Sequence, residues 1–134
     1  MEDVADTGSM SPVAQQLGFS VMIDEQAEPN VIYARGDLDS LSAGQLREAF
    51  VGVVGRPGVI VDICEVPFLD SAGLGALVGG IRRLRESGTT VALCCTTPRV
   101  LRLLDVTGLD RLVAVVSSHG AARDAIAEEQ LAIS

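Results

Sequence analysis

The apolar residues of the chain fall into short runs, and these runs predict a sheet. Five runs rich in Val, Ile, Leu and Ala have the composition of strands; they cover residues 19–24, 31–36, 59–63, 90–95 and 112–116. A turn at Pro29-Asn30 separates the first two, which predicts a hairpin. The third run is apolar almost throughout, as is typical of a parallel strand covered by helices on both faces.

Between these runs the apolar residues recur at helical spacing. The clearest helix begins near Ser71 and ends at Gly88. Its apolar stripe consists of Leu74, Leu77, Val78, Ile81 and Leu84. Further helices are predicted after a cap at Ser40 or Ser42, from Pro98 to Thr107, and from Ser118 to about Leu131.

The order of the predicted elements is β-β-α-β-α-β-α-β-α. Strands that alternate with helices form right-handed crossovers and a parallel sheet. We therefore predict one α/β domain over residues 19–131, with a mixed, mostly parallel sheet of about five strands, an N-terminal hairpin and about four helices. Residues 1–18 are rich in small and polar residues and are predicted to form a flexible tail.

Composition excludes several classes of partner. The 134 residues carry a net charge of −8 and no lysine, so we expect no direct contact with DNA or an anionic membrane, but a basic protein partner fits. No apolar run approaches the roughly twenty residues of a membrane span. The N-terminal residues lack the pattern of a signal peptide. These features predict a cytoplasmic protein without a membrane span.

The chain lacks the residue patterns of common catalytic sites. It has no phosphate-binding loop with its lysine, no complete dinucleotide fingerprint around Gly73 and Gly75, and no serine-hydrolase elbow. Its one histidine, His119, is predicted to be a surface residue, and nothing in the sequence places it near Ser71, so that serine has no base to activate it. We therefore predict that the chain is not an enzyme.

Ser71 is better explained as a phosphate acceptor. At the start of a helix its small hydroxyl projects from the surface, where a partner's active site can reach it. Gly73 and Gly75 are costly in a helix, and their lack of side chains would let a partner's backbone approach closely. The alternative is ordinary capping, with Asp70 or Ser71 accepting hydrogen bonds from the first helical turn.

Three aspartates, Asp37, Asp39 and Asp70, lie in loops that should share one edge of the sheet. They could bind Mg²⁺, contact basic residues of a partner, or form turns and caps. Phosphate on Ser71 would add about −1.5 to −2 charges beside them. A partner surface matched to a neutral hydroxyl would then be repelled, which predicts a switch without a large change of fold.

The three cysteines, Cys64, Cys94 and Cys95, are odd in number and lack metal-ligand spacing, so neither a disulfide framework nor a metal site is predicted. Cys94 and Cys95 are adjacent on a strand and should point to opposite faces. Cys64 ends the neighbouring strand and could pair with either of them. The alternatives are a redox role and buried, inert thiols.

Several short segments together resemble a known family. They are Asp70 to Gly75 after an apolar strand, Gly36 to Asp39 after the second strand, Thr97-Pro98 before the third helix, and residues 103–109. In this order and spacing they are similar to the anti-sigma factor antagonists of the STAS domain family. The resemblance covers roughly residues 19–131, nearly all of the predicted domain.

The resemblance implies a mechanism. The unphosphorylated domain would bind an anti-sigma factor that is also a serine kinase, and so free a sigma factor for transcription in a stress response. The kinase would supply ATP and Mg²⁺, so the domain needs no cofactor, and would phosphorylate Ser71; a PP2C-type phosphatase would reverse this. Contacts with the partner are expected at Asp37, Asp39, Ser40, Asp70, Ala72, Gly73, Leu74, Gly75 and Thr97.

One position departs from the family's pattern. The residue after the acceptor is often Ser or Thr in the family and is Ala72 here, so a second phosphorylation site is not expected. An alternative function stays open, because a STAS subunit of a lipid transporter or signalling scaffold acts by protein contact and needs no acceptor serine.

Overall fold

The computed structural model describes residues 18–133. Its five strands form one sheet in the order β1-β2-β3-β4-β5, in which β1 and β2 are antiparallel and the other neighbours are parallel. The strands are β1 (Ser20–Asp24), β2 (Asn30–Arg35), β3 (Gly58–Glu65), β4 (Thr90–Cys94) and β5 (Ala114–Val116). The predicted hairpin and mixed sheet are confirmed. The predicted tail lies, apart from Gly18, outside the described residues.

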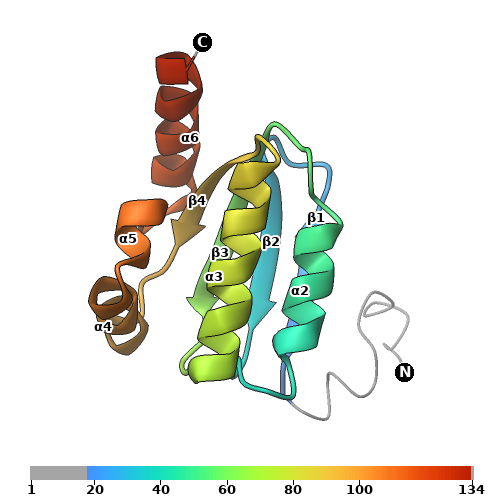
Figure 1. Cartoon of the computed structure of the whole chain (residues 1–134), viewed down its shortest axis with the longest axis vertical. Coiled ribbons are helices and arrows are strands. Elements are labelled where there is room, and N and C mark those ends of the chain that lie inside the picture. Colours follow the sequence, from blue (N-terminus) through green and yellow to red (C-terminus); the bar gives the residue numbers. More distant parts are fainter. Residues whose placement is uncertain (1–17, 134) are drawn as a thin grey trace.

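Helices pack on both faces of this sheet. They are α2 (Ala43–Val51), α3 (Ser71–Glu86), α4 (Pro98–Thr107), α5 (Leu109–Leu112) and α6 (His119–Ile133). Figure 1 shows α2 and α3 side by side in front of the sheet, with α3 beginning where β3 ends. Helix α6 packs on the other face, where its Ala122 and Ile126 meet Ile60 of β3.

The alternation of side chains along β3 and β4 divides the core in two. Val59, Val61 and Ile63 of β3 face the larger core under α2 and α3, whereas Ile60 and Cys64 face α6. At the end of the neighbouring strand β4, Cys94 faces α6, and Cys95, the next residue, faces the larger core. The prediction that the two adjacent cysteines point to opposite faces is therefore confirmed, and both are buried.

The prediction was wrong about the segment after α4. It placed Leu112 at the start of the last strand, whereas Leu112 ends α5 and β5 begins at Ala114. Gly108 explains the difference, because it adopts a left-handed conformation with φ of 80° that stops α4 and lets a short new helix begin. Leu109, the first residue of α5, is buried in the larger core. The described residues therefore contain five helices instead of about four.

Candidate functional site

The loops that follow β2 and β3 are joined to each other by backbone hydrogen bonds. The Leu38 N–H donates to the carbonyl of Phe68 at 3.0 Å, and the Asp70 N–H donates to the carbonyl of Leu38 at 3.1 Å. Leu38 and Leu69 are both buried and form a one-residue parallel bridge. The two loops therefore lie side by side at one edge of the sheet, next to the first turn of α3 (Figure 1).

Ser71 is the first residue of α3, and its side chain is exposed. Within residues 18–133 its hydroxyl makes no hydrogen bond. Asp70 caps the helix instead, because its Oδ1 accepts from the Gly73 N–H at 2.9 Å. Of the two alternatives for capping, the structure thus assigns the role to Asp70, and the Ser71 hydroxyl stays open to solvent at the positive end of a 16-residue helix.

This assignment gives a stability prediction for Asp70. Asp70→Ala removes the acceptor for the Gly73 N–H and should lower the free energy of unfolding by about 1 kcal/mol. Asp70→Asn is the matched control, since its amide oxygen can still accept that hydrogen bond. Urea denaturation measures both. Equal losses in the two variants would contradict a capping role.

The loop after β2 is held by Asp39 and Ser42. The Oδ1 of Asp39 accepts from the Leu41 N–H at 3.0 Å and from the Ser42 N–H at 3.2 Å. The buried hydroxyl of Ser42 accepts from the Asp39 N–H and donates to the carbonyl of Asp37, each at 2.9 Å. Ser42, rather than Ser40, occupies the cap position of α2, although its side chain makes no capping hydrogen bond. Asp39 therefore fixes the shape of this loop.

The Mg²⁺ interpretation of the three aspartates finds no support in this geometry. Asp37 is exposed, Asp39 bonds to its own loop and Asp70 bonds to α3. In the part of the chain that the structure describes, their carboxylate oxygens do not form a set that lies within 4.8 Å of one another. Turn and capping chemistry accounts for Asp39 and Asp70.

Gly73 and Gly75, the two glycines after Ser71, have different structural roles. Gly73 is buried, and a Cβ at this position would lie 2.1 Å from the carbonyl oxygen of Leu38. Its small size is thus required by packing inside the fold rather than by a partner. Gly75 is exposed, with nothing within 4 Å of a Cβ. The interpretation that a glycine lets a partner's backbone approach closely therefore applies to Gly75 alone. Ala72 and Leu74 are half-buried.

Two exposed apolar residues in the joined loops were missed from the sequence. Phe68 is 40% exposed and Leu41 is 68% exposed, and each lies in one of the two joined loops. The sequence signal that could have identified them is a large apolar residue inside a predicted loop. A hollow of about 240 Å³ lies between α2 and α3 and is lined by Gly75, with Arg47 and Arg83 among its other residues. Contiguous exposed apolar area marks protein-binding surfaces, so these two side chains are candidates for contact with a partner.

Thr97 lies at the same edge of the sheet as the loops around Ser71, but near the ends of β3 and β4. It is half-buried, and its hydroxyl donates to the carbonyl of Cys64 at 3.4 Å. An open hollow of about 420 Å³ between the ends of β3 and β4 is lined by Cys64, Glu65, Pro67, Thr96 and Thr97. No hydrogen bond between described residues links Thr97 to the loops around Ser71.

The cysteines separate into a pair and a single residue. The Sγ atoms of Cys64 and Cys94 lie 3.3 Å apart, and neither forms a disulfide. Burial, together with a hydrogen bond to Cys64, raises the pKa of the Cys94 thiol to about 12. Cys95 is buried in the opposite core, where burial also raises its pKa. Of the two possible pairings, the structure favours Cys64 with Cys94.

His119 is not an ordinary surface residue, so that prediction was wrong. Its Nε2 lies 2.6 Å from Oδ2 of Asp62, and its side chain is 30% exposed. Its ring also lies 5.6 Å from the ring of Tyr33. His119 and Asp62 lie on the α6 side of the sheet, beside Cys94, so this contact could not be read from their distant positions in the sequence.

No helix among residues 18–133 combines the length and the apolar character that crossing a bilayer requires.

Known proteins are similar to this chain in sequence and in fold. The model of the STAS domain matches residues 20–122. An anti-sigma-B factor antagonist of Bacillus subtilis is 31% identical over 101 residues, which cover 72% of this chain and 92% of the relative. The crystal structure of an anti-sigma factor antagonist from Mycobacterium paratuberculosis superposes with a TM-score of 0.68 at 25% identity, and the match covers 87% of this chain and 97% of that one.

A more distant neighbour is the Bacillus cell fate determinant SpoIIAA, solved in its phosphorylated form, with a TM-score of 0.60 and 20% identity over 76% of this chain and 96% of that one. This likeness concerns the fold. The family follows instead from the match of the STAS domain to most of the chain and from the Bacillus subtilis relative of similar length. The chain belongs to the STAS domain family, the family of the anti-sigma factor antagonists.

Proposed function

We propose that this chain is an anti-sigma factor antagonist whose binding is controlled by phosphorylation of Ser71. In the unphosphorylated state it binds an anti-sigma factor with serine kinase activity and so frees a sigma factor. Phosphate on Ser71 ends that binding, and a PP2C-type phosphatase restores it. The observation that carries the proposal is the exposed hydroxyl of Ser71, which makes no hydrogen bond among the described residues. Ser71 is the first residue of α3, the longest helix that the structure describes in this STAS domain.

The surroundings of Ser71 support a substrate rather than a catalyst. The one histidine of the chain contacts Asp62 on the α6 side, and the carboxylate of Asp70 is used as a helix cap. A base that takes the hydroxyl proton, together with ATP and Mg²⁺, would therefore come from the partner kinase. An ATP-dependent kinase fits a switch that operates in the cytoplasm.

The surface around Ser71 supports a protein partner. Phe68 and Leu41 offer exposed apolar area in the two joined loops, and Gly75 opens onto the groove between α2 and α3. A phosphate here is tolerated by the isolated domain, because the N-terminus of α3 favours negative charge. At an interface the same phosphate would have to lose its water opposite a surface shaped for a neutral hydroxyl, which disfavours binding.

Phosphate transfer tests the proposal. The wild-type chain, incubated with the anti-sigma factor kinase of its own organism and Mg²⁺-ATP, should gain one phosphate, and peptide mapping by mass spectrometry should place it on Ser71. Ser71→Ala should gain none. Ser117→Ala, which removes an exposed serine that is not among the expected partner contacts, should reach the wild-type stoichiometry. Labelling of Ser71→Ala to the wild-type level would refute the assignment of the acceptor.

A further inference from the structure

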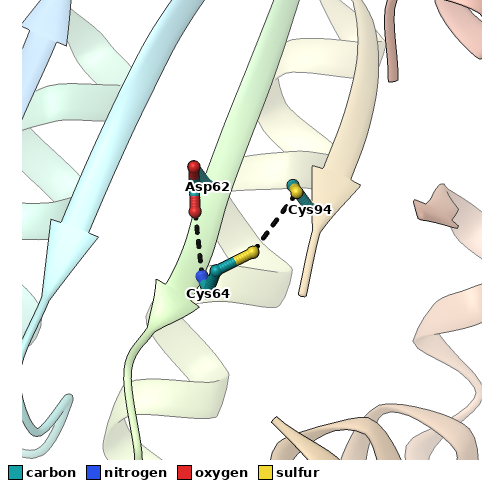
Figure 2. A group of neighbouring side chains, drawn as sticks. All are labelled: Asp62, Cys64 and Cys94. Atoms are coloured by element: carbon teal, nitrogen blue, oxygen red, sulfur yellow. Dashed lines mark hydrogen bonds between the residues drawn. The ribbon is translucent and has the colours of Figure 1, made fainter. Parts of the chain in front are cut away.

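Strand pairing brings metal-binding residue types together on the α6 side of the sheet. Asp62 of β3 and Cys94 of β4 are register partners, and Cys64 follows Asp62 on the same face (Figure 2). The carboxylate oxygen of Asp62 and the two sulfurs all lie within 4.8 Å of one another. His119, the first residue of α6, contacts the same carboxylate at 2.6 Å. Three residues from two strands thus form the cluster, and His119 of α6 contacts one of them.

We propose that this cluster binds one Zn²⁺ or a similar thiophilic divalent ion. The ligands are Sγ of Cys64, Sγ of Cys94 and a carboxylate oxygen of Asp62, and water completes the tetrahedron. His119 is a positioning residue, which holds the carboxylate of Asp62 by its ring nitrogen. The proposal is independent of the function of Ser71.

The separation of the sulfurs fits a shared metal ion. Two thiolates on one tetrahedral Zn²⁺, each about 2.3 Å from the ion, lie about 3.8 Å apart. The Sγ atoms of Cys64 and Cys94 are 3.3 Å apart, so a small rotation of either side chain is enough to admit the ion. Two sulfur ligands with one carboxylate favour Zn²⁺ over Mg²⁺ or Ca²⁺, which prefer oxygen.

The strand register argues for a metal ion rather than a disulfide. Asp62 pairs with Cys94, so Cys64 is offset by two residues along the adjacent strand. An offset of about 6.6 Å along a strand and about 4.8 Å between strands separates the two Cα atoms by about 8 Å. Disulfides usually span about 4.4 to 6.8 Å between Cα atoms, so a disulfide would require the backbone to move. A metal ion bridges the wider gap without that movement.

The residues around the cluster orient the carboxylate of Asp62 and leave a path by which an ion can enter. Asp62 lies on a face whose other core residues are apolar, and its side chain is only 15% exposed. The Cys64 N–H donates to its Oδ1 at 2.9 Å and His119 contacts Oδ2, which fixes the orientation of the carboxylate. Cys64 is half-buried and lines the open hollow beside Thr97, through which an ion can enter.

Cobalt binding tests the site in the fully reduced, full-length chain. Titration with Co²⁺ should saturate at one ion per chain and give the near-ultraviolet absorption of cobalt–thiolate bonds, and Zn²⁺ should displace the cobalt. Cys64→Ser and Cys94→Ala should each lower the affinity at least about tenfold and weaken this absorption. Cys95→Ala is the matched control, because Cys95 lies in the opposite core, and it should behave as wild type.

His119→Gln separates a positioning role from a ligand role. It should lower the affinity for Co²⁺ by about 10-fold to 100-fold, while the visible d–d bands of the bound Co²⁺, which depend on its whole ligand set, keep their wild-type position. A shift of these bands would instead indicate that His119 is a ligand. Far-UV circular dichroism of each variant checks the fold, and Cys64→Ser changes a half-buried side chain, so it tests the site even if Cys94→Ala is poorly folded. A wild-type chain without cobalt–thiolate absorption, or a Cys64→Ser chain that keeps it in full, would overturn the proposal.

Discussion

Replacing Gly73 with alanine is expected to destabilise the domain by roughly 3 kcal/mol. The new Cβ would lie 2.1 Å from the carbonyl oxygen of Leu38 and 2.7 Å from its carbonyl carbon, and this backbone cannot give way cheaply. Relief of the overlap would strain or break the two hydrogen bonds that join Leu38 to Phe68 and Asp70. Overpacking of a core costs about 1–3 kcal/mol, and each lost hydrogen bond adds about 1 kcal/mol.

Gly75→Ala is the matched control for this change. It lies in the same helix, is exposed, and has nothing within 4 Å of a Cβ, so alanine should be neutral or stabilise by up to about 1 kcal/mol. Urea denaturation of the wild type and both variants measures the difference. If the two alanine variants had the same free energy of unfolding, the close packing of α3 against Leu38 would be contradicted. Gly73→Ala should also slow phosphorylation of Ser71, because the close contact between Gly73 and Leu38 positions the loop that precedes Ser71.

The strands and most of the helices could be predicted because their signals are local. The apolar run around Val61 identifies a buried strand, and the spacing of Leu74, Leu77 and Ile81 identifies α3. The end of α4 at Thr107 was correctly expected, but the short helix after it depends on the burial of Leu109, which is a tertiary contact. The position of Ser71 at the start of α3 also follows from local pattern.

What could not be predicted depends on the register of neighbouring strands and on how the helices and loops pack against them. The close contact of Gly73 joins it to Leu38, which lies in a loop far away in the sequence. The cluster of Asp62, Cys94 and His119 arises from the pairing of β3 with β4 and from the docking of α6. Spacing along the sequence does not reveal such contacts, which is why the metal site proposed above was not expected.

Ser71→Glu is expected to lose most of its affinity for the anti-sigma factor while the domain stays folded. Ser71 is exposed and its side chain makes no hydrogen bond among residues 18–133, so a longer side chain costs the fold little. A carboxylate at the first position of α3 should even add about 0.3–1 kcal/mol of stability through the helix dipole. At the interface the charge must be desolvated, and a loss of at least about tenfold in affinity is expected.

Ser71→Gln and Ser71→Ala separate charge from size in that experiment. Glutamine has nearly the shape of glutamate without its charge, so it should bind more tightly than Ser71→Glu, and alanine should bind as the wild type does. Isothermal titration calorimetry gives the affinities, and thermal unfolding checks that all variants are folded. Equal losses for Glu and Gln would show that bulk, rather than charge, controls the contact.

The most direct measurement compares the two natural states of the wild-type chain. Its affinity for the anti-sigma factor is measured before phosphorylation, after stoichiometric phosphorylation confirmed by mass, and again after a PP2C-type phosphatase has removed the phosphate. The account predicts tight binding in the first and third states and a loss of at least about tenfold in the second. Equal affinity in all three states would contradict the proposal that Ser71 controls the partner.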